Sequence, residues 1–429
     1  FLESFDADPN KRGTQWEHVC KWFLKNDQQY RAFLTDVWLW DDWPGRQGQE
    51  VGIDLVAQTR QGDLWAIQAK CYAADTNVTR NDMAKFIAAS EGREFTQRLL
   101  MATSSGVAPA VNDWMEYATP PIALCLRHDL ETRDCWPESY AAWSSDVFPK
   151  PERKTADPHQ TTAMQDTLEG LRHHDRVQTL MACGTGKSLV ALWVHEGVGS
   201  TRTLVLVPSI QLVKQTIKEW IENRQSSFEI LPVCSDDTVR DQNPDPAVSR
   251  SAELGYPVEV DPAKIQRFLQ DTGPRVVFST YQSGRAVAAA LAGTDLEFDL
   301  VVADEAHHCA GRGNRVFSTV LDQDQIRARK RVFMTATPRL YTPRRGESDV
   351  PDEIASMDNV EHFGPEVHKL SFGQAIAKGL LSTYQLVVVG VQEEECLRYV
   401  QRGTPVELEG EVETDAREGK VQSDARTLA

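Results

Sequence analysis

The sequence predicts an α/β protein made of two consecutive domains. Short apolar segments typical of strands alternate with segments of helical periodicity over most of the 429 residues, a length that suits two or three domains. One apolar segment, residues 177–182, runs into a glycine-containing loop and then into a second apolar stretch that begins at Leu189. This order of strand, tight loop and helix is typical of α/β architecture.

The composition limits the kind of surface the protein presents. It has 46 Lys and Arg against 63 Asp and Glu, a formal net charge of -17 and a pI of about 5.1. Such a balance argues against a protein that binds nucleic acid over its whole surface. It leaves room for DNA held in a local groove by backbone amides and a few cations.

Neither a membrane span nor a secretion signal is expected. The sequence has no run of about 18 apolar residues and no signal-peptide pattern after Phe1. Its eight cysteines are scattered and form no C-x-x-C motif, so we expect reduced thiols and a cytoplasmic location. The alternative is an oxidising compartment with a Cys125–Cys135 disulfide.

The first domain, expected at residues 1–147, combines an amphipathic helix with a hairpin. We predict a helix at 15–31, in which Glu17 lies beside the apolar stripe. Strands are predicted at 36–43, 51–58 and 64–72, with a turn at 60–63. Further elements follow as helix 79–91, strand 98–103, helix 111–117 and strand 122–126.

The hairpin carries residues suited to phosphodiester cleavage. Asp54 lies on its first strand, and Gln68 and Lys70, two residues apart, share a face of its second. A carboxylate and an amide oxygen can hold Mg²⁺ beside a phosphate, and a lysine can position water or stabilise developing charge. The alternative is a cross-strand salt bridge between Asp54 and Lys70, worth about 0.2–1 kcal/mol.

The sets Gly52-Ile53-Asp54 and Gln68-Ala69-Lys70 resemble the PD-(D/E)xK nucleases, and especially their Mrr-type branch. That branch has Gln in place of the second acid and a Glu on the first helix, here Glu17. The resemblance implies a nuclease-like fold in which Glu17, Asp54, Gln68 and Lys70 are catalytic and Asp54 and Gln68 bind the metal. With one acid fewer, the affinity for metal is expected to be modest.

Composition changes at 148–158, where three prolines and several charges predict a linker. Beyond it, the loop after residues 177–182 contains Gly184, Gly186, Lys187 and Ser188. Glycines let backbone N–H groups close around phosphate oxygens, and the following helix adds its positive N-terminus. Lys187 would reach the β- and γ-phosphates of ATP, and Ser188 would bind Mg²⁺.

Two later strand ends complete this pattern. Residues 298–303 form an apolar strand that runs into Asp304-Glu305-Ala306-His307, and 332–334 run into Thr335-Ala336-Thr337-Pro338. The first supplies a carboxylate for Mg²⁺ and a neighbouring Glu that can polarise water.

In this order the motifs resemble the DEAH-box motor of superfamily 2 helicases and translocases, with a RecA-like parallel sheet. The resemblance covers roughly residues 155–395 and implies a first motor lobe at 159–343. It implies that Glu305 is catalytic and that Ser188 and Asp304 bind Mg²⁺. Ser209 and Ser279, each at a strand-to-helix turn, correspond to the loops that contact DNA phosphates. The ATP-binding residues that it implies are Gln160 (with Gln165 as the alternative), Gly184, Thr185, Gly186, Lys187, Ser188, Asp304 and His307.

His307, His308 and Cys309 are adjacent, but a closed zinc site needs four ligands at recurring spacing, so zinc is not expected. After Pro338 we predict a helix at 370–381 and a strand at 384–391. Residues 344–429 are therefore expected to form a connector and the start of an incomplete second lobe.

An Mrr-type nuclease, a linker and a DEAH motor, in that order, resemble ATP-dependent restriction enzymes of type ISP and type I. This implies an endonuclease coupled to a translocase on double-stranded DNA, with ATP and Mg²⁺ as cofactors. Further domains would follow, namely a second motor lobe, a methyltransferase and a target-recognition domain. Two alternatives are a translocase whose first domain only docks on DNA, and a nucleic-acid motor of repair or RNA metabolism.

Overall fold

The computed structural model describes most of residues 1–383, together with strands β15 (Pro405–Glu407) and β16 (Gln422–Asp424). The undescribed segments before residue 384 are 47, 49–51, 110, 112–113, 116–117, 134, 144–147, 149–151, 236–250, 313–316 and 341–353. Phe1–Leu381 form one compact unit, and the second unit, Ser382–Ala429, contains the antiparallel pair β15 and β16. Across the described residues, no helix is long and apolar enough to cross a membrane.

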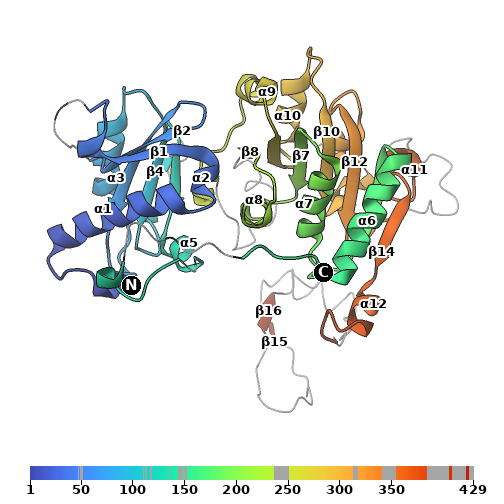
Figure 1. Ribbon diagram of the computed structural model, residues 1–429, viewed down its shortest axis with the longest axis horizontal. Coiled ribbons are helices and arrows are strands. Elements are labelled where there is room, and N and C mark those ends of the chain that lie inside the picture. The colour runs from blue at the N-terminus through green and yellow to red at the C-terminus, as the bar shows by residue number, and fades with distance from the viewer. Residues whose placement is uncertain are drawn as a thin grey trace. The chain divides into compact units, whose positions relative to one another are not determined.

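The N-terminal part of the first unit is a five-stranded sheet of order β1-β2-β3-β4-β5 (Figure 1). The first three strands are antiparallel neighbours, whereas β3, β4 and β5 pair in parallel. The strands are β1 (Leu34–Leu39), β2 (Leu55–Thr59), β3 (Leu64–Lys70), β4 (Phe95–Ala102) and β5 (Ile122–Cys125). The helical elements are η1 (Leu2–Ser4), α1 (Pro9–Asn26), α2 (Tyr30–Phe33), η2 (Trp40–Asp42), α3 (Arg80–Ser90), α5 (Arg127–Glu131) and η3 (Tyr140–Ala142).

Each face of this sheet buries its own apolar cluster. On β3, Trp65 and Ile67 join the cluster that includes Trp16 of α1, whereas Ala66 joins the cluster that includes Phe86 of α3. Alternation along the strand therefore places Gln68 on the α3 side, on the same face as Ala66.

The predicted hairpin is present, but its first strand begins later than expected. Regular pairing of β2 with β3 starts at Leu55, so Asp54 immediately precedes the strand. Ile53 consequently packs in the α3-side cluster with Val56, whereas Leu55 packs in the other cluster. The left-handed backbone of Gly52, with φ of 86°, bends the chain just before this point.

The second sheet has seven strands, all parallel, in the order β14-β6-β12-β10-β7-β9-β8. They are β6 (Arg176–Met181), β7 (Arg202–Val207), β8 (Glu229–Val233), β9 (Arg275–Thr280), β10 (Phe298–Asp304), β12 (Ala328–Thr335) and β14 (Glu366–Leu370). A short antiparallel pair joins β11 (Gly311–Arg312) to β13 (Ile354–Ala355). The parallel arrangement brings the carboxyl ends of β6, β12, β10, β7 and β9 to one edge of the sheet.

Helices connect these strands, as expected for parallel crossovers (Figure 1). Their bounds are α6 (Pro158–His173), α7 (Lys187–Val198), α8 (Ile210–Asn223), η5 (Ser251–Leu254), α9 (Pro262–Gln270), α10 (Gly284–Leu291), η6 (Ala306–Cys309), η7 (Phe317–Leu321), α11 (Val360–Phe363) and α12 (Phe372–Ala377). Ser209 caps α8 by accepting a hydrogen bond from Leu212 N–H, as its position predicts.

Several predicted boundaries need correction. The aromatic segment 36–43 is only partly a strand, because β1 ends at Leu39 and a 3₁₀ turn follows. The motor sheet continues past residue 343, because β14 pairs with β6. The helix expected at 370–381 is confined to Phe372–Ala377. The strand predicted at 384–391 and part of the helix predicted at 111–117 lie outside the described residues.

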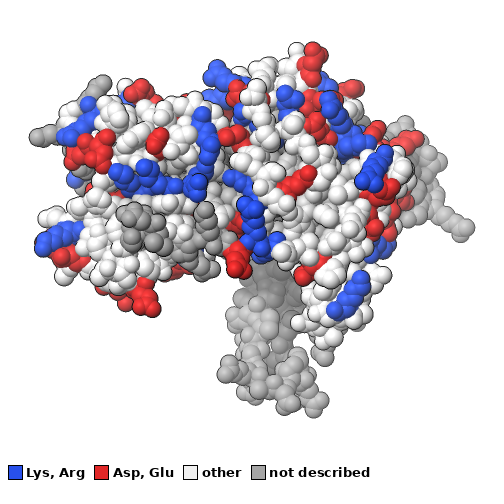
Figure 2. Space-filling view, in the orientation of Figure 1, with Lys and Arg blue, Asp and Glu red and all other residues white. Residues whose placement is uncertain are grey.

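On the face shown in Figure 2, acidic and basic side chains are interspersed rather than gathered by sign.

Candidate active sites

The loop between β6 and α7 has the backbone geometry of a phosphate cradle. Gly184 and Gly186 both adopt left-handed conformations, with φ of 80° and 83°. A Cβ at Gly186 would lie 2.2 Å from Gln160 Nε2, so both the conformation and the space require glycine there. Thr185 Oγ1 closes the loop by donating to Ala182 O at 2.7 Å.

Gln160 holds this loop from α6. Gln160 lies in the first turn of α6. Its Nε2 donates to Thr185 O at 3.1 Å, and its Oε1 accepts from Asp157 N–H at 3.0 Å. The sequence analysis missed His159, whose Nε2 also lies 3.1 Å from Thr185 O. The alternative residue, Gln165, is exposed on the same helix.

Lys187 and Ser188 begin α7 at the centre of this site. Lys187 is 8% exposed, and its Nζ lies 3.3 Å from Glu305 Oε1. Ser188 Oγ is buried without a hydrogen-bond partner. An orphaned hydroxyl beside a phosphate cradle fits a ligand of Mg²⁺, which accepts oxygen donors of this kind.

The end of β10 brings acidic residues to the same place. Burial of the Asp304 carboxylate, and then the negative charge of Glu305, raise the pKa of Asp304 to about 6, although the charge of Lys187 lowers it. His307 Nδ1 lies 2.9 Å from Thr335 Oγ1 and 3.4 Å from Glu305 Oε2. Burial lowers the pKa of His307, which favours its neutral form.

The structure thus brings together residues that the sequence predicted for the motor site. Thr335 of β12 contacts this group. Thr335 Oγ1 donates to Glu305 Oε2 at 3.4 Å and so links the Thr-Ala-Thr-Pro motif to the acidic motif. In the described part of the chain, no group of three or more His, Cys, Asp and Glu residues could hold a metal.

In the first sheet, Asp54 is fixed between β1 and β3. It is 6% exposed, its carbonyl accepts from Trp40 N–H at 2.9 Å, and its N–H donates to Ile67 O at 2.9 Å. Its Oδ2 accepts from Ala69 N–H at 2.6 Å. These bonds place Asp54 opposite Gln68 of β3. This position directly precedes the first regular pair of the hairpin, Leu55 with Ile67.

The side-chain amide of Gln68 has a hydrogen-bond partner for only one of its two polar atoms. Its Nε2 donates to Gly52 O at 3.1 Å, whereas its Oε1 is buried without a hydrogen-bond partner. Because an amide oxygen buried in this way loses its hydration, it fits a ligand of Mg²⁺.

Glu17 and Lys70 extend this site in different directions. Burial raises the pKa of the Cys20 thiol, and the charges of Asp54 and Glu17 raise it further, so both carboxylates lie near the same thiol. Lys70 is partly exposed, and its charge acts on Asp82 of α3. Burial raises the pKa of Asp82, but hydrogen bonds from Thr79 and the charge of Lys70 lower it more, so the net pKa is lowered. No ion pair joins the described residues Asp54 and Lys70, so the salt-bridge alternative is wrong.

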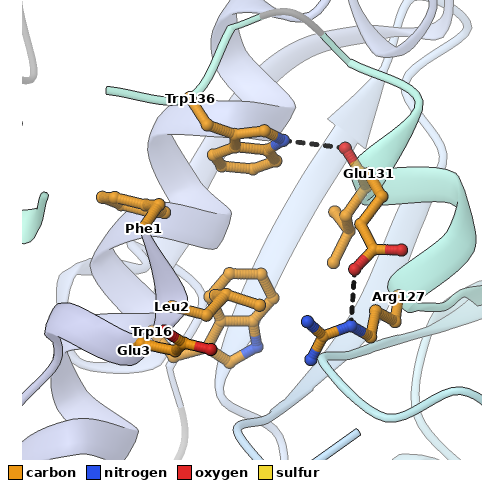
Figure 3. A pocket seen from close by; sticks show the side chains of 8 residues that line it. Phe1, Leu2, Glu3, Trp16, Arg127, Glu131 and Trp136 are labelled. Atoms are coloured by element: carbon orange, nitrogen blue, oxygen red, sulfur yellow. Dashed lines mark hydrogen bonds and ion pairs between the residues drawn. The ribbon is translucent and has the colours of Figure 1, made fainter. Parts of the chain in front are cut away.

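A separate pocket of about 400 Å³ lies between the N-terminal segment and α5 (Figure 3). Phe1, Leu2, Trp16 and Trp136 give it apolar walls. At its side, Arg127 Nε pairs with Glu131 Oε1 at 2.6 Å. The pocket contains none of the predicted site residues.

Comparison with known families agrees with this arrangement. Residues 25–141 match the family model Mrr_cat_2, described as restriction endonuclease, and residues 153–340 match ResIII, described as type III restriction enzyme, res subunit. The chain therefore joins an Mrr-type nuclease domain to a helicase-like motor domain. This confirms the predicted fold class, a nuclease-like α/β domain followed by a RecA-like lobe.

Among solved structures, the chain is similar to the ATP-dependent Type ISP restriction-modification enzyme LlaBIII bound to DNA. The TM-score is 0.73 and the identity 27%, over 91% of this chain and 26% of that enzyme. The probable helicase A859L of African swine fever virus (strain Badajoz 1971 Vero-adapted) is 28% identical over 232 residues, which are 54% of this chain and 24% of the viral protein. The chain spans about a quarter of the length of these relatives, and the predicted resemblance to type ISP enzymes is confirmed.

Proposed function

We propose that the chain is the nuclease and first motor lobe of an ATP-dependent DNA restriction endonuclease. The observation that carries this proposal is a pair of buried oxygens without partners, Gln68 Oε1 in the first sheet and Ser188 Oγ in the second. In the proposal, Gln68 would bind Mg²⁺ together with Asp54, and Ser188 would bind Mg²⁺ together with Asp304. The family matches and the similarity to a type ISP enzyme support the same function.

In the motor, the loop amides and Lys187 would hold the phosphates of ATP, with Gln160 beside them for the adenine edge. Ser188 and Asp304 would hold Mg²⁺, which neutralises phosphate charge when bound. Glu305 would orient the attacking water once Lys187 turns to the phosphates, because the Lys187–Glu305 pair of 3.3 Å occupies both side chains. His307 and Thr335 would keep the Glu305 carboxylate in place.

In the nuclease, Asp54 and Gln68 would hold Mg²⁺ next to the scissile phosphate of double-stranded DNA. The bound ion would supply Lewis acidity and lower the pKa of water. Lys70 would position that water or stabilise the developing charge, and Glu17 would support the site from α1. Because only Asp54 of these two ligands carries a negative charge, the affinity for Mg²⁺ would be modest.

Cleavage in this proposal depends on domains beyond the first motor lobe. A second RecA-like lobe would complete the ATP site, and a methyltransferase and a target-recognition domain would direct cleavage, as the type ISP resemblance implies. The protein would act in the cytoplasm. The match of residues 25–141 to a restriction-endonuclease model disfavours the alternative of a first domain that only docks on DNA.

The test uses the full-length protein with site-containing DNA, ATP and Mg²⁺, and measures ATP hydrolysis and strand cleavage in the same reaction. Lys187→Ala should reduce both activities by about a hundredfold or more, because the phosphate clamp is lost. Asp54→Ala should reduce only cleavage, by a similar factor. Asp63→Ala, in the β2–β3 turn, is the matched control and should cut at the wild-type rate.

Two outcomes would contradict this function. Full ATP hydrolysis by Lys187→Ala would refute the motor. Cleavage at the wild-type rate by Asp54→Ala would show that the hairpin is a scaffold, and the docking alternative would then hold.

A further inference from the structure

Tyr281 connects two strand ends that are not neighbours in the sheet. It follows β9, is 2% exposed, and its N–H donates to Val207 O at the end of β7 at 3.1 Å. Its hydroxyl donates to Asp304 O, at the end of β10, at 2.7 Å. Because β7 lies between β9 and β10, the side chain spans the width of one strand.

Tyr281 donates to the peptide group between Asp304 and Glu305, and both polar atoms of this peptide are hydrogen-bonded. Its oxygen accepts from Tyr281, and its N–H, that of Glu305, donates to Asp304 Oδ1 at 2.9 Å. Glu305 has a φ of 50°, the one positive φ among the described non-glycine residues. A left-handed backbone is unfavourable for a residue with a side chain, so neighbouring contacts must maintain it.

The orientation of this peptide decides where the Glu305 carboxylate points. It now reaches Lys187 Nζ at 3.3 Å and Thr335 Oγ1 at 3.4 Å. The Tyr281 phenol also hydrogen-bonds the Cys309 thiol, at the far end of the short helix after Glu305. Tyr281 therefore contacts the acidic motif on both sides of Glu305.

The backbone that carries Tyr281 is itself rigid. Thr280 Oγ1 donates to Ser283 Oγ at 3.1 Å and accepts from Ser283 N–H at 3.3 Å. Burial raises the pKa of Tyr281 well above its ordinary value, so the hydroxyl remains a donor at neutral pH. A displacement of the 279–283 loop would consequently move the peptide that orients Glu305.

We propose that Tyr281 is a positioning residue for ATP hydrolysis, and that it links the orientation of Glu305 to the 279–283 loop. This inference rests on the proposed function, in which Glu305 orients the attacking water.

The test is Tyr281→Phe in the full-length protein, which keeps the ring and removes the hydroxyl. We expect the kcat of DNA-stimulated ATP hydrolysis to fall about tenfold, because a mispositioned catalytic group loses much of its effect. The KM for ATP and the affinity for DNA should stay within about twofold, since the residues that would bind each are unchanged. If Tyr281 had only a structural role, the variant would have a lower melting temperature, and kcat would not fall independently of KM.

Tyr256→Phe is the matched control, because Tyr256 is also 2% exposed but its hydroxyl has no hydrogen-bond partner. It should hydrolyse ATP at the wild-type rate. Cys309→Ala removes the other contact of the phenol and should lower kcat about threefold. If Tyr281→Phe does not fold, the kcat of Cys309→Ala tests the positioning role of Tyr281 instead.

Glu305→Gln separates this inference from the function on which it rests. A loss of about a hundredfold in Glu305→Gln supports the proposed motor. If that loss occurs but Tyr281→Phe keeps the wild-type kcat, the positioning role is wrong and the motor stands. If Glu305→Gln hydrolyses ATP normally, the proposed function itself fails.

Discussion

The two sheets present their candidate metal ligands in different ways. In the motor lobe, Lys187, Asp304, Glu305 and Thr335 interact with one another, so the charged groups occupy each other before any ligand arrives. In the nuclease domain, the Asp54 carboxylate is tied to a backbone N–H and the Gln68 amide to a backbone carbonyl.

This difference has a functional consequence. The motor site has to break an ion pair before it can act, which suits a cycle driven by binding and release of ATP. The nuclease ligands are held by the sheet itself, and only Lys70 and Glu17 lie outside that backbone frame. In the proposed function, control of cleavage would therefore come from delivery of DNA rather than from rearrangement of Asp54 and Gln68.

The largest expected effect tests the preformed loop of the motor. Gly186→Ala should weaken nucleotide binding about a hundredfold or more, because the new Cβ meets Gln160 and the left-handed backbone resists a side chain. Gly199→Ala is the matched control, since Gly199 has a φ of 66° and nothing within 4 Å of its Cβ. Titration with a fluorescent ATP analogue measures both. Equal affinities in the two variants would show that the cradle is not preformed.

A second prediction concerns the stability of the motor lobe at acid pH. Burial lowers the pKa of His195 to about 4, and its Nδ1 lies 2.8 Å from Thr203 Oγ1. In the unfolded chain His195 takes up its proton near its ordinary pKa of about 6.5, so the unfolded state binds more protons between these values. Stability is therefore lost as the pH falls through this window.

The loss should amount to about 2 kcal/mol between pH 7 and pH 5. Urea unfolding of the wild type and of His195→Asn, followed at both pH values, measures it. The variant should be less stable at pH 7 but should lose less stability on acidification. An identical loss in the two proteins would exclude His195 as the cause.

The smallest expected effect sharpens the description of the nuclease. Gln68→Glu adds a second negative charge beside Asp54 and should lower the Mg²⁺ concentration for half-maximal cleavage about tenfold. Gln58→Glu, on the neighbouring strand β2, is the matched control and should leave that concentration unchanged. A metal requirement that does not respond to Gln68→Glu would mean that this side chain does not bind the metal.

Much of this structure could be predicted from the sequence because its signals are local. Strand, glycine loop and helix follow one another directly around Lys187, and the hairpin turn at 60–63 joins two adjacent strands. Asp304 and Glu305 come directly after an apolar strand, which predicted their place at a sheet edge. Each of these predictions needed only neighbouring residues.

The rest depended on contacts between distant segments. Strand β14 has one buried residue, Leu370, and only its parallel pairing with β6 places it in the sheet. Asp54 is displaced from the regular strand by the bend at Gly52, which alternation could not show. The bond from Tyr281 to Asp304 crosses an intervening strand, and no pattern in the sequence predicts it.

Metal binding tests most directly whether the chain contains two separate Mg²⁺ sites. Mn²⁺ bound to the full-length protein can be counted by electron paramagnetic resonance, with DNA and with or without a non-hydrolysable ATP analogue. We predict one bound ion with DNA alone, lost in Asp54→Ala, and a second that appears with nucleotide and is lost in Asp304→Ala. Loss of both ions in either variant, or of neither in Asp54→Ala, would contradict two independent sites.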